Sequence, residues 1–151
     1  KSSTRIMSLR DGTKKMSKSD ISEYSRVLMT DTNDQISNKI KKAKTDSMNM
    51  PENISDAVKR PEINNLLNIY SACSNRNSED SIAEFSGKEI SFFKDCLTEA
   101  VISIIEPISS KAKDLMNDKP YLDEILVKGA NNARKIAADK ITAIHKLIGM
   151  A

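Results

Sequence analysis

The sequence predicts an all-α protein. Of its 151 residues only 4 are glycine and 4 are proline, aromatic residues make up 4%, and tryptophan is absent. This composition disfavours turn-rich β folds and favours helices with cores of leucine, isoleucine, methionine and alanine. Apolar residues recur at helical spacing in most of the chain after about residue 33. A hydrophobic content of 38% is enough for a lean core, and an antiparallel helical bundle is the simplest arrangement.

The segment before the first helix is predicted to be a short extended stretch followed by a loop. Residues 5–9 are interpreted as the last part of a preceding domain, with Ile6 and Leu9 facing inward. Gly12 follows an aspartate, and this pair is a turn signal. The Lys- and Ser-rich stretch 14–20 then predicts a mobile loop and not a helix.

A short basic helix is predicted over about 33–44. Thr32 and Gln35 have the spacing of a capping box, and isoleucines follow at helical spacing. The stretch 45–59 carries Pro51 and several Asn and Ser residues, so it is predicted to be a loop with little regular structure.

A second helix is predicted to begin at Pro61, because proline is tolerated in the first turn. It should end near residues 75–77, before a brief helix over 78–85 that Gly87 terminates. The apolar face expected to enter the core consists of Ile63, Leu66, Leu67 and Tyr70.

Two long helices are predicted for the remainder. The first begins near Lys88, and Pro107 should kink or divide it before it resumes through Leu115. The second begins at Pro120 and continues to the carboxyl end, with small residues at 129, 130 and 133 that would let a neighbouring helix approach. Its apolar stripe, interpreted as packing surface, contains Leu122, Ile125, Leu126, Ala133, Ile136, Ala137, Ile141, Ile144 and Leu147.

Several kinds of site are not indicated. Cys73 and Cys96 have no neighbouring metal ligands and are interpreted as reduced thiols in or near the core, so no metal site is expected. His145, the single histidine, lies near a predicted helix end and is interpreted as structural. No signal peptide or apolar run of membrane-spanning length is present, which indicates a soluble, cytoplasmic protein with no membrane partner.

The net charge of +3 is unevenly distributed. The first 44 residues carry 11 Lys and Arg against 5 Asp and Glu, whereas the rest carry 13 against 16. The basic end suits a phosphate-bearing partner. For Lys39, Lys41, Lys42 and Lys44, a solvated helix face and an RNA contact are equally consistent with the sequence.

The loop has the chemistry of a phosphate-binding loop. Lys15 and Lys18 are mobile point charges that can meet the negative charge of a phosphate-bearing ligand. The hydroxyls of Ser17 and Ser19 can donate further hydrogen bonds to phosphate oxygens. The alternative for a short Lys- and Ser-rich stretch taken alone is a solvated surface turn without a ligand.

Residues 15–19 spell KMSKS, the signature of class I aminoacyl-tRNA synthetases, and the flanking sequence resembles one family among them. Residues 6–13, 31–36, 61–71 and 121–130 are similar, in this order, to blocks of the tryptophanyl-tRNA synthetases. Two positions depart from the family pattern, Gly12 and Ile21, where many members have proline; both changes should loosen the flanks of the loop.

The resemblance implies a two-part organisation. Residues 1–29 would end a Rossmann-type catalytic domain whose HIGH-type motif and tryptophan pocket lie outside this chain, and residues 30–151 would form a helical anticodon-binding domain. The implied function is the carboxyl-terminal part of a tryptophan–tRNA ligase, with the isolated chain inactive. The ATP-binding residues that the resemblance implies are Ile6, Lys15, Met16, Ser17, Lys18 and Ser19, of which Lys15 and Lys18 would be catalytic.

The implied partners are ATP, with magnesium as its bound ion only, and tRNA(Trp). The full-length enzyme would be a homodimer, which leaves a monomer open for the fragment. No short motif marks the anticodon contacts, so the tRNA-binding candidates are only basic residues expected to be exposed: Lys88, Lys94, Lys111, Lys113 and Arg134. A stand-alone helical RNA-binding module without catalysis and a plain helical interaction protein remain as alternatives.

Overall fold

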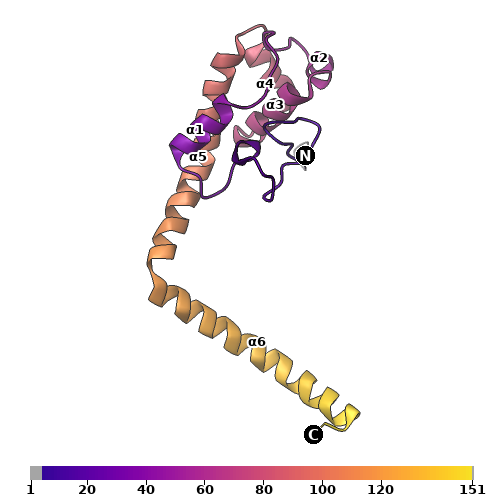
Figure 1. Ribbon diagram of the computed structural model, residues 1–151, viewed down its shortest axis with the longest axis vertical. Helices are drawn as coiled ribbons and strands as arrows, with labels where there is room; N and C mark the ends of the chain where they lie inside the picture. The colour runs from indigo at the N-terminus through magenta and orange to yellow at the C-terminus, as the bar shows by residue number, and fades with distance from the viewer. Residues whose placement is uncertain (1–4, 151) are drawn as a thin grey trace. The chain divides into compact units, whose positions relative to one another are not determined.

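The computed structural model describes residues 5–150 and confirms the all-α class (Figure 1). The chain forms two compact units, one up to Ser110 and one from Lys111 onward, and each is described by itself. Within the described residues, the only β pairing is an isolated bridge near the amino end. The helices are α1 (Asn33–Lys41), α2 (Ile54–Val58), α3 (Pro61–Cys73), α4 (Ser78–Phe85), α5 (Ile90–Asn117) and α6 (Lys119–Ile148), with a 3-10 turn at Glu23–Ser25.

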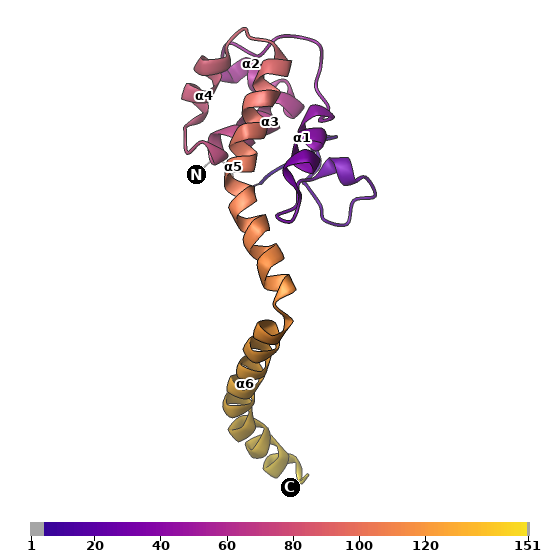
Figure 2. The same ribbon diagram turned by 90° about the vertical axis from the view of Figure 1, so that its left-hand side faces the viewer.

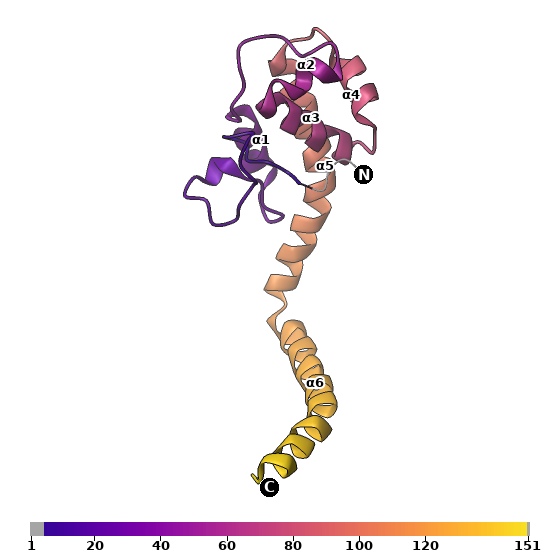
Figure 3. The ribbon, with the colours of Figure 1, turned by 90° about the vertical axis from the view of Figure 1, so that its right-hand side faces the viewer.

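The core of the first unit lies among α1, α3, α4 and the first half of α5. Figures 2 and 3 show α3 beside α5, with α1 on the side of the pair away from the marked amino end. An aromatic cluster fills the centre, where the ring of Phe85 lies 4.9 Å from both Tyr70 and Phe93 in edge-to-face geometry. The predicted core face of α3 is confirmed, since Ile63, Leu66, Leu67 and Tyr70 are all buried.

The predicted helix starts are also confirmed. The Thr32 hydroxyl accepts from the Gln35 backbone N–H, and the Gln35 side chain accepts from the Thr32 N–H, which completes the capping box of α1. Pro61 occupies the first turn of α3. Asn77 caps α4 by accepting from the Asp80 N–H.

Three local expectations are wrong. The predicted loop 45–59 contains α2, because Asn53 caps its first turn and Ala57 is buried against the core. Of the two outcomes predicted for Pro107, division of the helix is wrong, because α5 continues through it, whereas a kink stays a prediction. The carbonyl that loses its hydrogen-bond donor there belongs to Ser103, which is exposed, so water can replace the missing N–H. Ile6 does not face inward with Leu9, since it is 39% exposed and Leu9 2%; residues three apart in an extended segment point to opposite faces.

Helix α6 forms the second unit together with the end of α5. Asp118 caps its start by accepting from the Tyr121 N–H, and Gly149 ends it in the left-handed conformation that favours glycine. None of its residues is buried, so the packing of its apolar stripe stays a prediction. Among residues 5–150, no helix is both long enough and apolar enough to span a membrane.

An ion pair fixes the chain that enters α3. The Arg60 Nε donates to Asp46 Oδ2 at 2.7 Å, and its other nitrogens donate to the carbonyls of Met48 and Asn49. The hydrogen bond from the Arg60 guanidinium is the main reason that the pKa of Asp46 is lowered. The folded chain therefore holds Asp46 ionised more strongly than the unfolded chain does.

We expect Asp46→Asn to reduce the acid sensitivity of the first unit. A carboxyl whose pKa is depressed on folding stabilises the fold above its ordinary pKa, and this contribution is lost as the pH falls through the folded value. The urea midpoints of wild type and Asp46→Asn should therefore differ at neutral pH and converge in acid. A gap between the two midpoints that stays constant with pH would contradict this account.

Candidate functional site

The KMSKS loop, residues 15–19, follows a short antiparallel pairing of residues 6–8 with residues 14–16, which we call the loop base. Met7 and Lys15 form the isolated antiparallel bridge, and on either side Ser8 N–H donates to Lys14 O at 2.8 Å and Met16 N–H donates to Ile6 O at 3.1 Å. The first lysine of the signature is thus positioned by backbone pairing with the segment before it.

The turn that closes this base lies against the start of α3. Asp11 accepts from both the N–H and the hydroxyl of Thr13, and the hydroxyl bond is the main reason that the pKa of Asp11 is lowered. A Cβ added to Gly12 would lie 2.5 Å from the Glu62 nitrogen and 2.5 Å from the Pro61 carbonyl carbon. Glycine is therefore required here by close backbone approach, and Gly12 joins the loop base to α3 instead of loosening it.

Gly12→Ala is expected to destabilise the first unit by about 1–3 kcal/mol, because the new methyl group would overlap main-chain atoms that cannot rotate away. The urea midpoint of the chain measures the effect. The matched control is Gly129→Ala in α6, where the added carbon would meet nothing within 4 Å and the alanine should be neutral or stabilising. Equal midpoints for Gly12→Ala and wild type would show that the contact is not tight.

The loop itself presents its cations to solvent. Lys15 and Lys18 are exposed, and within residues 5–150 neither ammonium group has a hydrogen bond or an ion pair. Lys14, by contrast, pairs with Asp11 at 3.4 Å. Met16 is partly buried against the core and anchors the loop. The two ammonium groups are thus available to an anionic ligand.

The serines organise the turn between the two lysines. The hydroxyls of Ser17 and Ser19 lie 3.1 Å apart, and the Ser19 N–H donates to Ser17 Oγ at 3.4 Å. Both side chains are exposed. Donation from these hydroxyls and the nearby backbone N–H groups to phosphate oxygens stays a prediction.

Sequence reasoning missed the residue that holds the downstream end of the loop. Arg26 donates from one guanidinium nitrogen to Asp20 O at 2.9 Å and to Ser22 O at 3.2 Å. Leu9, which precedes the loop, is bonded to two segments that follow it. Its N–H donates to Ser25 O at 2.9 Å, and its carbonyl accepts from Lys44 N–H at 2.8 Å. An isolated arginine seven residues after the signature gives no sequence signal for this role.

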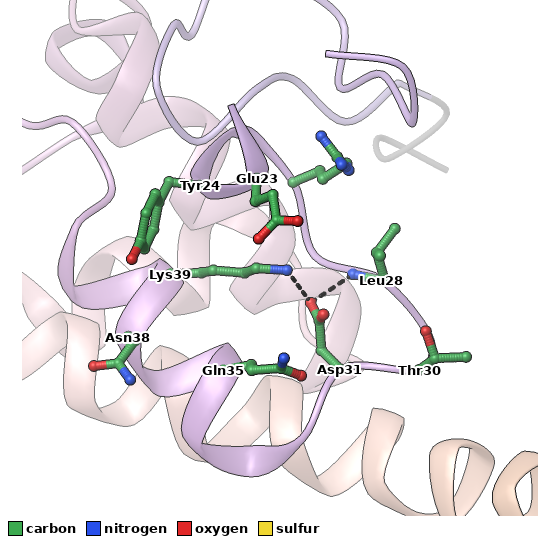
Figure 4. Close-up of a pocket in the computed structure, with 9 residues that line it drawn as sticks. Glu23, Tyr24, Leu28, Thr30, Asp31, Gln35, Asn38 and Lys39 are labelled. Atoms are coloured by element: carbon green, nitrogen blue, oxygen red, sulfur yellow. Dashed lines mark hydrogen bonds and ion pairs between the residues drawn. The ribbon is translucent and has the colours of Figure 1, made fainter. Parts of the chain in front are cut away.

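A cavity of about 410 Å³ lies between the 3-10 turn and α1 (Figure 4). Inside it the Lys39 ammonium lies 2.6 Å from Asp31 Oδ2, which also accepts the Leu28 N–H at 2.8 Å. Both partners are buried, so Lys39 is neither a solvated cation nor an available RNA contact. The cavity is lined by none of the KMSKS residues, and its ion pair is internal.

Other lysines of the basic end also have internal partners. Lys42 lies over the Tyr24 ring, 4.3 Å from its centroid, and Lys44 pairs with Glu62 at 2.9 Å. Only Lys41 of the four lysines is an exposed side chain without a hydrogen bond or ion pair among the described residues. Three of these four lysines therefore interact with other residues of the fold and are not all available to a ligand.

The five predicted tRNA-binding residues are divided between the two units. Lys88 and Lys94 belong to the first unit, and Lys111, Lys113 and Arg134 belong to the second. Lys94 is half-buried, and its ammonium caps α1 by donating to Lys41 O at 3.2 Å and Ala43 O at 2.8 Å; burial lowers its pKa. Its expected exposure is wrong, and a role of any of the five in tRNA binding stays a prediction.

The two cysteines and the histidine lie where the sequence predicted, and their structural role stays a prediction. Cys73 and Cys96 are free thiols packed against the edge of the core, as predicted, and burial raises the pKa of both. His145 lies in the last turn of α6, where its carbonyl accepts the N–H of Met150. Within the described residues, no group of three or more His, Cys, Asp or Glu side chains is arranged to hold a metal ion.

Comparison with known proteins defines the class. The family described as tRNA synthetases class I (W and Y) matches residues 2–106, and the chain belongs to this family. Within it, the resemblance to the tryptophan enzymes is confirmed. The chain is 48% identical to the tryptophan–tRNA ligase of Rickettsia conorii over 97% of its length, and 42% identical to that of Caulobacter vibrioides over 96%.

Two solved structures of tryptophanyl-tRNA synthetases also match the chain. The tryptophanyl-tRNA synthetase of Mycoplasma pneumoniae matches 97% of this chain with a TM-score of 0.72 at 27% identity. That of Campylobacter jejuni matches 96% with a TM-score of 0.73 at 23% identity, which supports the fold alone. The chain spans less than half of the proteins it matches, 42–44% of the two ligases and 43–44% of the two structures.

Proposed function

We propose that the chain is the carboxyl-terminal part of a tryptophan–tRNA ligase, with the KMSKS loop as its ATP-phosphate site and the helices as its tRNA(Trp)-binding part. The observation that supports this proposal most is the loop: two exposed lysines without internal partners stand on a base that is tied to the core. The chain belongs to a family of class I tRNA synthetases, and the relatives it resembles are tryptophan–tRNA ligases, which supports the same reaction for the full-length protein.

The proposed mechanism follows from the charge of the loop. Attack of the tryptophan carboxylate on the α-phosphate of ATP moves negative charge onto the leaving pyrophosphate. Lys15 and Lys18 meet this charge, and because both can move with the loop they stabilise the transition state more than bound ATP. Magnesium enters as the ion bound to ATP. Residues 1–29 then contribute to catalysis and residues 30–151 to recognition of the anticodon.

The proposal places the full-length protein in the cytoplasm as a homodimer that serves protein synthesis. It also implies that the chain alone is inactive, because it spans less than half of the ligases it resembles. We expect the isolated chain to show no tryptophan-dependent ATP–pyrophosphate exchange above background. Clear exchange by the isolated chain would contradict the division of labour proposed here.

The helical part is tested by tRNA binding. We expect the chain to bind a transcript of tRNA(Trp) more tightly than the same transcript with an altered anticodon, and the affinity to fall as salt rises. Binding that ignores the anticodon would favour a general RNA-binding module. Absence of any salt-dependent binding would favour a helical interaction protein.

A further inference from the structure

Asn65 of α3 makes an unusual long-range contact with the base of the KMSKS loop. Its side-chain oxygen accepts the Met7 N–H at 2.8 Å, and its side-chain nitrogen donates to Met7 O at 2.9 Å, although 58 residues separate the two in sequence. The side chain is buried, at 4% exposure. The indigo amino-terminal segment passes close to α3 in Figure 3, and both residues of the contact belong to the first unit.

The contact acts on the backbone that positions Lys15. Met7 is the residue that bridges Lys15, and the flanking hydrogen bonds join Ser8 to Lys14 and Met16 to Ile6. So short a pairing is marginally stable on its own. The carboxamide of Asn65 occupies the other hydrogen-bonding edge of Met7, as a neighbouring strand would.

Only a carboxamide suits this place. It offers one acceptor to the N–H and one donor to the carbonyl, whereas a leucine would leave both main-chain groups unpaired in a buried position. An ionised aspartate would accept from the N–H but set a negative charge against the Met7 carbonyl oxygen.

We propose that Asn65 is a positioning residue for ATP activation: it fixes the register of the loop base from α3, and so the place from which Lys15 reaches the phosphates. This inference rests on the proposed function for its catalytic consequence. The structural part, the control of the loop base by Asn65, stands on the contacts alone.

The neighbouring residue provides the control. Asn64 precedes Asn65 in α3, is half-buried, and its side chain makes no hydrogen bond among residues 5–150. Asn64→Asp and Asn65→Asp therefore make the same chemical change in adjacent positions of one helix. Only Asn65→Asp is expected to weaken the hydrogen bonds of the loop base.

The structural arm measures amide hydrogen exchange by NMR on the chain. In Asn65→Asp we expect the Ser8 and Met16 amides to lose protection by ~10-fold or more at neutral pH, while the Leu66 and Leu67 amides of α3 keep theirs. In acid the protonated aspartate can again donate to the Met7 carbonyl, so protection should recover after correction for intrinsic exchange. Asn64→Asp should leave all four amides unchanged.

Two outcomes overturn the proposal. Unchanged protection of Ser8 and Met16 in Asn65→Asp would show that the contact does not control the loop base. Loss of protection in α3 together with the loop base would make Asn65 a general folding residue. The position of the loss keeps the two roles apart: acid relieves a buried carboxylate in either role, whereas a loss confined to Ser8 and Met16 is expected only if Asn65 controls the loop base.

The kinetic arm uses the full-length protein and ATP–pyrophosphate exchange. Asn65→Asp should lower kcat by ~10- to 100-fold, the scale expected of a displaced catalytic group, with the KM for tryptophan unchanged and Asn64→Asp equal to wild type. An unchanged kcat would remove Asn65 from the mechanism. If wild type itself shows no tryptophan-dependent ATP–pyrophosphate exchange, the proposed function fails. Amide hydrogen exchange at Ser8 and Met16 still decides whether Asn65 holds the loop base.

Discussion

Lys18→Ala in the full-length protein is expected to lower the kcat of tryptophan activation by about 10²–10³-fold, equivalent to roughly 2.7–4 kcal/mol, by analogy with the loss of one oxyanion donor. The reason is that the Lys18 ammonium is exposed on the loop and unpaired within the described residues, so its interaction is available to the charge that develops on pyrophosphate. Tryptophan binding should change little, because the predicted contact of Lys18 is with phosphate. ATP–pyrophosphate exchange and a tryptophan-binding titration measure the two effects separately.

The matched control for this result is Lys14→Ala. Lys14 stands in the same loop, but its ammonium is engaged with Asp11 at 3.4 Å, and the pair is exposed enough to contribute little stability. The control variant should retain most of the activity. An unchanged rate in Lys18→Ala, or an equal loss in both variants, would argue against a specific role for Lys18.

Asp31→Ala is expected to destabilise the first unit by about 3–5 kcal/mol, the cost of leaving a buried charge without its partner. The Lys39 and Asp31 side chains are 9% and 5% exposed, and Asp31 also accepts the Leu28 N–H. The variant leaves both the ammonium and the N–H unpaired. The shift in the urea unfolding midpoint of the chain gives the change in the free energy of unfolding.

A surface pair provides the comparison. Lys59 and Asp56 are 70% and 50% exposed, so Lys59→Ala should cost at most about 1 kcal/mol. Joint replacement of the buried pair, as Asp31→Leu with Lys39→Met, should recover much of the loss because no charge is then left buried. If Asp31→Ala and Lys59→Ala have similar midpoints, the Asp31–Lys39 pair does not stabilise the fold as described.

Local chemistry explains why much of the fold was predictable. The capping box of Thr32 and Gln35 depends on residues three apart, and Pro61 fits the first turn of a helix wherever it occurs. The apolar face of α3 is a matter of helical spacing. Such signals are complete within a few residues of sequence, so no tertiary information is needed to read them.

The parts that escaped prediction depend on partners distant in sequence. Helix α2 is held by the burial of Ala57. Lys39, for which the sequence left a solvated helix face and an RNA contact open, is instead buried in an ion pair with Asp31. Periodicity gave no reason to single out Asn65, whose partner Met7 lies 58 residues away. In the candidate site, the sequence therefore identified the lysines proposed to meet the phosphates but not Arg26 and Asn65, which hold the loop from either side.

The central claim, a ligase specific for tryptophan, is tested most directly by amino-acid-dependent ATP–pyrophosphate exchange in the full-length protein, because the family includes enzymes for both tryptophan and tyrosine. The account predicts exchange that requires tryptophan, is not supported by tyrosine and falls sharply in Lys18→Ala. Exchange driven by tyrosine, or no exchange with either amino acid, would contradict it.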